Sequence, residues 1–384
     1  MRWPTLLRDV KQHTNAWMLV SLLGAAVILL PLALIPLSLF HAPNENWAHI
    51  KQYLLKGYLL NSLWLVLWTG VGTVITATGL AWLVAAHDFP LRGFFRWALL
   101  LPLTVPPYIA AYTYADMFSY TGIVQKSLRS AFGITPAPKW FGIMSLRGAI
   151  FIFTLFLFPY LYLIIRSFVE RQSAAYVENA RVLGRGPWAI FFHVILPLAR
   201  PAIVAGLTLV AFEVLSDYGV TSYYGVATIS TAIFQTWFGM YDVESAIRLA
   251  ALLMVGVVSL LLVERIVRGN RRYSSSTTQS RPYVLRPLRG IHAVGAVLVC
   301  GVIFAFSFLI PFLQLLVWAT WTYADVLNAA FGQMLFRTLY LALVATAVIM
   351  LLATIVANVH RTSDNALSYA LSRSVTACFS VPGA

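Results

Sequence analysis

Residues 149–168 read AIFIFTLFLFPYLYLIIRSF, a run of twenty residues that contains one charge, Arg166. A helix of roughly 20 apolar residues crosses a hydrocarbon layer about 30 Å thick. Because the run is continuously apolar, and does not alternate as a barrel strand would, it predicts a membrane-spanning helix. Similar runs recur, and the predicted spans are residues 16–40, 58–86, 97–118, 149–168, 201–219, 246–267, 291–320 and 337–357, with a ninth beginning near residue 374.

The composition places the whole chain in the membrane class. Hydrophobic residues make up 60% of it, charged residues only 10%, and the mean hydropathy is +0.79, whereas a soluble domain carries roughly 25% charged residues. The predicted fold class is therefore all-α, a polytopic helical membrane protein. The run at 16–40 is too long for a cleaved signal peptide, so we expect a true span there. Cys300 and Cys378 have no near-sequence partner and indicate neither a disulfide framework nor a metal-ligand pair.

The distribution of basic residues predicts the orientation. Most of the 27 lysines and arginines fall in the segments that face inward when the N-terminus is cytoplasmic. The net charge of +14 is then explained by contact with an anionic inner leaflet, and no nucleic-acid partner is expected. The outward loop 119–148 is an exception, because it carries Lys126, Arg129, Lys139 and Arg147. Two interpretations remain open for it, a docking surface for an outside partner and tolerated interfacial charge.

An internal repeat divides the chain. A shift of 276 residues aligns NSLWL at 61–65 with RTLYL at 337–341, and Val105-Pro106 with Val381-Pro382. We expect two homologous multi-helix halves: a first unit at 1–267 with about six transmembrane helices, a hydrophilic cytoplasmic linker at 268–290, and the start of a second, incomplete unit at 291–384. The second half is expected to be truncated, and a chain with one complete half is not expected to transport.

A polar loop at 170–200 separates two apolar spans on the inward side. It contains Glu178-Asn179-Ala180, then Gly184 and, after nine intervening residues, Val194-Ile195-Leu196-Pro197. Gly184 permits a tight turn, and Pro187 directly after Gly186 suits the first turn of a helix. The spacing predicts two short helices joined by a turn, which could lie in a groove of another protein. An amphipathic interfacial helix would explain the arginines and aromatic residues here, but not the glycine and proline spacing.

This loop resembles the coupling loop of permease subunits of ABC importers, in which Glu-Ala-Ala is followed by three residues, Gly, nine residues, Ile, one residue and Leu-Pro. Asn179 and Val194 are mild departures. The resemblance implies that the loop contacts a separate ATPase, Glu178 meeting a basic group and Trp188, Phe191 and Phe192 supplying apolar contact. The residues assigned to coupling are Glu178, Asn179, Ala180, Gly184, Gly186, Pro187, Ile195, Leu196 and Pro197.

Four further stretches resemble the ferric-iron importer permeases, a binding-protein-dependent family. They are residues 85–90 (AAHDFP), 101–108 (LPLTVPPY), 216–219 (SDYG) and 235–240 (QTWFGM). The resemblance implies a permease that moves ferric iron across a bacterial inner membrane by alternating access. Thiamine, polyamine or sulfate permeases are the alternatives within this class. An ion-coupled secondary transporter is the alternative outside it, but it would not need the glycine-proline loop.

The chain lacks a phosphate-binding Gly-Lys-Ser or Gly-Lys-Thr sequence. We therefore expect no enzyme activity and no cofactor in this chain. The resemblance implies that ATP and Mg are used by cytoplasmic ABC ATPase subunits, and that a periplasmic or extracellular solute-binding protein delivers the substrate. No converging catalytic set of the kind a membrane-embedded enzyme needs is apparent.

Charged residues near the outer ends of spans are the candidates for the translocation path. Glu213 and Asp217 are four residues apart, on one helix face, with Tyr218 beside them. Their oxygen ligands would suit a ferric ion; alternatively the pair caps a helix or bonds a neighbouring one. Tyr112 and Asp116 form a similar, weaker candidate, and no metal ligand is firmly assigned. Prolines 102, 106 and 107 break the third span, either to flank a pathway or as simple kinks.

Overall fold

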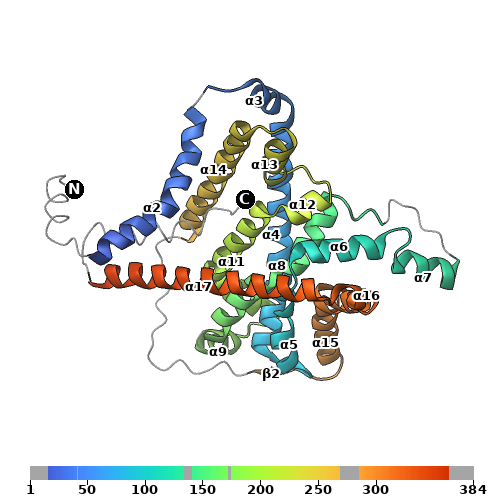
Figure 1. Ribbon diagram of the computed structural model, residues 1–384. Coiled ribbons are helices and arrows are strands. Elements are labelled where there is room, and N and C mark those ends of the chain that lie inside the picture. Colours follow the sequence, from blue (N-terminus) through green and yellow to red (C-terminus); the bar gives the residue numbers. More distant parts are fainter. Residues whose placement is uncertain (1–15, 41, 134–140, 172–173, 269–284, 363–384) are drawn as a thin grey trace.

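The computed structural model describes residues 16–40, 42–133, 141–171, 174–268 and 285–362, and these residues are almost entirely helical (Figure 1). The predicted ninth span near residue 374, Cys378 and most of the linker lie outside them. The predicted all-α class is confirmed. Six helices in the described residues are long and apolar enough to cross a membrane, or seven if a bent pair counts as one span.

The described part of the chain up to residue 133 contains two long helices and several short elements. Its elements are α2 (Ala16–Leu37), η1 (Ser38–Phe40), α3 (Glu45–His49), η2 (Ile50–Leu54), α4 (Leu55–Ala86), β1 (His87–Asp88), α5 (Arg92–Ala98), η3 (Leu101–Thr104), α6 (Pro107–Phe118) and α7 (Ile123–Phe132). The segment predicted as a span at 97–118 is helical but bent. Segments Arg92–Thr104 and Pro107–Phe132 meet at an angle of 90°, because Pro106 and Pro107 cannot continue the helical hydrogen bonding.

The middle part follows the prediction more closely. It contains α8 (Leu146–Arg171), α9 (Ala174–Val182), α10 (Pro187–Ile190), η5 (Phe191–Ile195), α11 (Leu196–Ser216), α12 (Gly219–Tyr223), α13 (Ile229–Phe234), η6 (Gln235–Gly239) and α14 (Val243–Arg268). The span predicted to begin at residue 201 begins earlier, since Pro187–Ser216 forms one continuous helical stretch.

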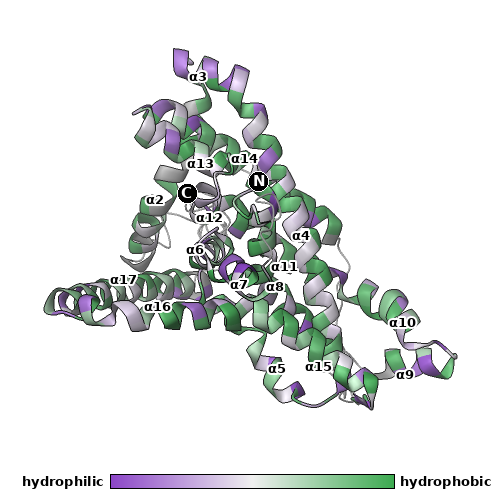
Figure 2. Ribbon diagram, turned by 90° about the vertical axis from the view of Figure 1, so that its right-hand side faces the viewer, coloured by the Kyte–Doolittle hydropathy of each residue, from purple (hydrophilic) through white to green (hydrophobic). Residues whose placement is uncertain are grey.

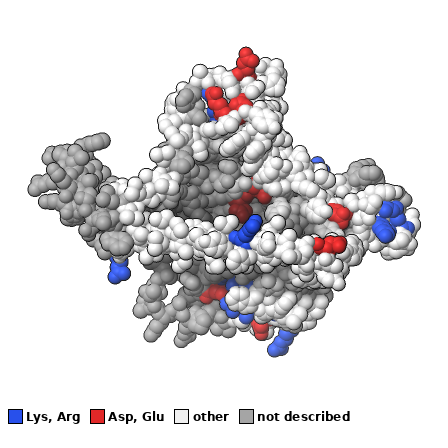
Figure 3. Space-filling view, viewed as in Figure 1, with Lys and Arg blue, Asp and Glu red and all other residues white. Residues whose placement is uncertain are grey.

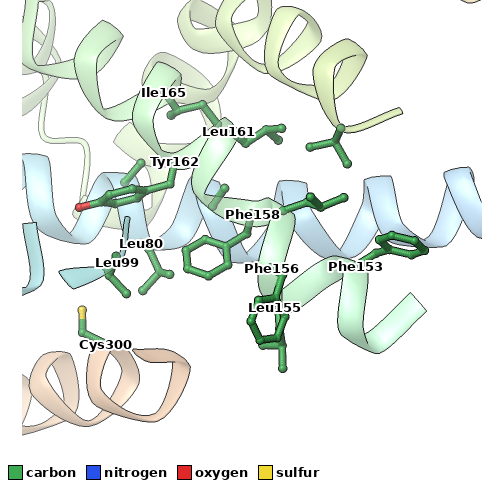
Figure 4. Close-up of a cluster of buried hydrophobic side chains, with 14 of the residues drawn as sticks. Leu80, Leu99, Phe153, Leu155, Phe156, Phe158, Leu161, Tyr162, Ile165 and Cys300 are labelled. Atoms are coloured by element: carbon green, nitrogen blue, oxygen red, sulfur yellow. The ribbon is translucent and has the colours of Figure 1, made fainter. Parts of the chain in front are cut away.

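Helix α8 forms the centre of the bundle and packs between α4 and α11. Its fully buried aromatic side chains, among them Phe153, Phe156 and Tyr162, form the core shown in Figure 4. A methyl group on Gly72 of α4 would lie 2.6 Å from the Thr154 hydroxyl, so the missing side chain allows α4 and α8 to approach closely.

Arg166, the charge inside the first quoted run, is buried in α8. Its guanidinium donates a hydrogen bond to the Arg96 carbonyl, and it lies 3.8 Å from Glu170. Glu170 also pairs with the Arg96 side chain at 2.9 Å. A buried charge in a span is stabilised by such partners, and the Arg166 cluster holds α5 against α8.

The last part begins with β2 (Arg286–Pro287), followed by α15 (Ile291–Phe304), η7 (Ala305–Leu309), α16 (Ile310–Val326) and α17 (Ala329–Thr362). Cys300 of α15 is fully buried and points toward Leu99 of the first part (Figure 4). Helix α17, which the predicted repeat aligns with α4, crosses the bundle (Figure 1) and packs on α2. The side chains in the most apolar part of α17 are largely exposed. The division into two homologous units stays a prediction.

One short pairing joins the end of α4 to the segment before α15. Strands β1 and β2 are parallel, with His87 opposite Arg286 and Asp88 opposite Pro287. The Leu288 amide donates to the Asp88 carbonyl at 2.8 Å. The end of the predicted linker is therefore fixed to the end of α4.

Candidate coupling loop and translocation path

The loop at 170–200 contains the predicted tight turn between helices. Gly184 has a φ of +74°, a conformation that glycine adopts readily. The Arg185 amide donates to the Ala180 carbonyl at 3.0 Å, and the Gly184 amide donates to the Arg181 carbonyl at 2.9 Å. This is a Schellman motif. The spacing between Ala180 and Gly184 is thus explained by how α9 ends.

The second half of the loop differs from the expected short helix. Pro187 occupies the first turn of α10, and the Ile190 amide donates to the Gly186 carbonyl at 3.0 Å. Helix α10 then continues without a break through η5 into α11. Ile195 is buried and Leu196 half-buried, so these two coupling candidates pack inside the bundle and do not lie on the loop surface.

The exposed surface of the loop is largely apolar. Figure 2 shows α9 and α10 projecting from one end of the bundle. Val182 and Leu183 at the turn are 87% and 80% exposed, and Trp188 is 76% exposed. Trp188 stacks on Phe192 with ring centroids 6.3 Å apart. We name Val182, Leu183, Trp188 and Phe192 the loop tip. Val182 and Leu183 were not predicted as contacts, although two apolar residues directly before a turn glycine were a usable signal.

The remaining coupling candidates divide between surface and interior. Glu178, Asn179, Gly186 and Pro197 are exposed, whereas Ala180 is buried. An exposed apolar tip next to exposed polar side chains is typical of a protein-binding surface. Glu178 and the loop tip are therefore exposed together, whereas Ala180, Ile195 and Leu196 are buried or half-buried.

Asp217, a candidate for the translocation path, caps α12. Its carboxylate accepts hydrogen bonds from the Val220 amide at 2.8 Å and from the Thr221 amide at 3.4 Å. Its backbone carbonyl accepts from the Ser230 hydroxyl at 2.8 Å. Of the two interpretations of the Glu213 and Asp217 pair, these contacts support the cap for Asp217. Glu213 is exposed on α11.

The other pathway candidates lie among aromatic side chains. Tyr112 of α6 contacts Tyr223 of α12 and Trp318 of α16, with ring centroids 5.6 and 5.5 Å apart. The Tyr218 ring packs against the Phe234 ring in a tilted arrangement, with centroids 4.2 Å apart. Asp116 is exposed one turn after Tyr112. The surface is hollowed above α17, and acidic atoms lie in that hollow (Figure 3). Within the described ranges no three His, Cys, Asp or Glu side chains gather as metal ligands.

A polar cluster at the opposite end of the bundle from the loop tip was not predicted. The Asn44 amide donates to the Asp242 carboxylate at 2.9 Å, and Asn46 donates to it at 3.1 Å. The Ser245 amide donates to the same carboxylate at 3.0 Å. Burial alone would raise the pKa of Asp242, but these hydrogen bonds outweigh it and lower the pKa. The cluster fixes the segment before α3 to the start of α14.

The long apolar helices and the bent segment define a polytopic helical membrane protein. Residues 77–272, just over half of the chain, match the family described as binding-protein-dependent transport system inner membrane component. The chain belongs to this family of ABC importer permeases.

Several curated relatives show what the chain is similar to. It is 27% identical over 231 residues to Fe(3+)-transport system permease protein FbpB 2 of Haemophilus influenzae, covering 60% of this chain and 41% of the relative. It is 29% identical over 198 residues to molybdenum transport system permease protein ModB of Escherichia coli, covering 50% and 84%. It is 26% identical over 201 residues to sulfate transport system permease protein CysT of Escherichia coli, covering 50% and 68%.

A solved structure shares the fold. The chain superposes on a chain of a bacterial ABC transporter involved in the import of the acidic polysaccharide alginate, with a TM-score of 0.53 and 16% identity, covering 70% of this chain and 100% of the other. The similarity to the ferric relative spans about two fifths of that protein's length.

Proposed function

We propose that this chain is the membrane-spanning subunit of an ATP-driven importer of ferric iron in a bacterial inner membrane, with its N-terminus cytoplasmic. The observation that carries the importer role is the glycine turn between α9 and α10, which presents an apolar tip on a rigid base. In this proposal the loop tip enters a groove of a cytoplasmic ABC ATPase, which binds ATP and Mg. ATP binding then moves the loop and rocks the attached helices in alternating access.

A periplasmic or extracellular solute-binding protein is the proposed partner at the other end. Helix α7 carries Lys126 and Arg129 on this side. The Arg129 guanidinium lies 4.1 Å from the centre of the Tyr120 ring and donates to the Tyr120 carbonyl, whereas Lys126 is exposed. These contacts favour a docking surface in which Arg129 supports the helix end and Lys126 faces the partner.

The proposed substrate is ferric iron, supported by the similarity to the ferric relative and by the four stretches that resemble ferric permeases. A second candidate is an oxyanion, because the molybdenum and sulfate relatives are matched over larger shares of their own length. The cap formed by Asp217 also leaves its carboxylate less available to a metal ion.

Site-directed crosslinking tests the importer role. We expect Leu183→Cys, in native membranes, to crosslink to a nucleotide-hydrolysing subunit, and the yield to change when ATP is added. Leu262→Cys serves as the control, because Leu262 is exposed on α14 away from the loop. Equal crosslinking of the two cysteines, or none from Leu183→Cys, contradicts the role.

Uptake of labelled substrate tests the specificity. Cells that lack the chain should lose uptake of ferric iron, keep uptake of molybdate and sulfate, and recover iron uptake when the wild-type gene is restored. Loss of oxyanion uptake with normal iron uptake would instead favour the second candidate.

A further inference from the structure

A cavity of about 250 Å³ lies beside the loop at the end of α4. Three chain segments form its wall. Trp82 and His87 come from the end of α4 and β1, Arg181 and Arg185 come from the coupling turn, and Arg286 comes from β2. Every charged side chain that lines this cavity is an arginine.

Backbone hydrogen bonds hold these arginines in place. The parallel pairing of β1 and β2 sets Arg286 opposite His87. The Schellman turn fixes Arg181 and Arg185 on either side of Gly184. Trp82 packs edge-on against His87, with ring centroids 5.6 Å apart. The fold therefore sets the backbone positions of the three arginines around the cavity.

The three arginines make the cavity electropositive, and their charge acts on the neighbouring His87. Burial lowers the pKa of His87, and the positive charges of Arg286 and then Arg181 lower it further. At neutral pH the imidazole is therefore neutral, and the three guanidinium groups supply the charge. A guanidinium presents paired donors whose geometry matches phosphate oxygens.

The cavity is small for a drug-sized ligand, whose pockets measure about 300–1,000 Å³. A phosphate group needs far less room and would be shared by several arginines. Basic pockets at the cytoplasmic ends of transmembrane helices are suited to anionic lipid head groups, and the loop lies on the side proposed to be cytoplasmic.

We propose that this cavity binds a phosphate group held by Arg181, Arg185 and Arg286. The bound anion joins the coupling turn to the β2 segment, so that a movement of the loop is passed directly to the chain that leads into α15. The group belongs either to an anionic lipid or to free inorganic phosphate. The three arginines that would bind phosphate all belong to this chain, so phosphate binding can be tested without its partners and whatever the transported substrate is.

Thermal unfolding of the purified full chain in detergent tests the proposal. The two probes are inorganic phosphate, compared with chloride at equal ionic strength, and dihexanoyl phosphatidylglycerol, compared with dihexanoyl phosphatidylcholine. We expect at least one probe to raise the Tm in a saturable way. Phosphatidylglycerol alone would identify the lipid source, and stabilisation by inorganic phosphate would identify the free anion.

The variants assign the effect to this cavity. Arg286→Gln should weaken the apparent affinity at least fivefold, and Arg286→Lys should recover part of it. Arg265→Gln should behave as wild type, because Arg265 is exposed on α14 and does not line the cavity. Absence of a saturable shift with both probes, or equal affinity in Arg286→Gln and wild type, overturns the proposal. Arg286 is exposed, so its substitution is not expected to prevent folding.

Discussion

The Ala180 carbonyl accepts a hydrogen bond from the Arg185 amide at 3.0 Å, across Gly184 with its φ of +74°. This bond ends α9 and directs the chain back toward the bundle. Gly186, two residues later, has a φ of −71°, which any residue adopts. The two glycines of one loop are therefore under different constraints, and that difference can be measured.

Gly184→Val should reduce coupling, because a β-branched residue in the left-handed region costs roughly 1–2 kcal/mol or more. The expected result is a clear loss of crosslinking between Leu183→Cys and the partner ATPase. Gly186→Ala is the matched control, since an added methyl group there meets nothing within 4 Å. If both variants crosslink as the parent does, the left-handed turn is not needed for docking.

Asp217→Asn separates a structural role from a charge role. Asparagine keeps an oxygen that can accept from the Val220 amide, so stability and uptake should stay near wild type. Asp217→Ala removes the acceptor and should lower the free energy of unfolding by about 0.5–2 kcal/mol. The measurements are chemical unfolding and substrate uptake. Normal stability with lost uptake in Asp217→Asn would show that the carboxylate charge acts in transport.

Asp242→Asn should destabilise the protein by about 1–3 kcal/mol, because the hydrogen bonds from Asn44, Asn46 and the Ser245 amide would lose a charged acceptor. Since the folded-state pKa of Asp242 is lowered, its contribution is present above the unfolded pKa of about 4. That contribution is lost as the pH falls through the lower folded-state value. Thermal unfolding at pH 7 and at acid pH measures both effects. Asp325→Asn, at an exposed position on α16, should leave the Tm unchanged.

Gly72→Ala should loosen the contact between α4 and α8, because the new methyl group would lie 2.6 Å from the Thr154 hydroxyl. We expect a loss of about 1–3 kcal/mol, with partial recovery in Gly72→Ala/Thr154→Ala. Gly79→Ala in the same helix has open space around it and should be neutral or slightly stabilising. Equal unfolding free energies for the two single variants would show that the helices can separate without cost.

Features encoded locally could be predicted from the sequence. Continuous apolar runs predicted the long helices, since hydrocarbon thickness sets their length. The spacing of Ala180 and Gly184 predicted the turn, because a helix end needs that offset. The resemblance in the same stretch predicted the family.

Features that depend on distant partners could not be predicted. His87 and Arg286 carry no pairing signal, because a two-residue ladder has no periodicity to detect. The hydrogen bond between Asn44 and Asp242 could not be predicted, because the two residues are 198 positions apart in the sequence. The proline break at 106 and 107 was predicted, but its 90° angle depends on how α6 packs on α8 and α12. Glu213 and Asp217 looked equivalent on one helix face, yet α11 ends between them.

The unbroken run from Pro187 to Ser216 makes the loop one end of a rod. Thirty residues at 1.5 Å each give a length of roughly 45 Å, so a tilt of roughly 5° about its centre shifts each end by about 2 Å. In the proposed mechanism, a small displacement of Pro187 would therefore move the Asp217 end of the helix sideways by a similar distance. The bending stiffness of this helix determines how much of a displacement at Pro187 reaches Asp217.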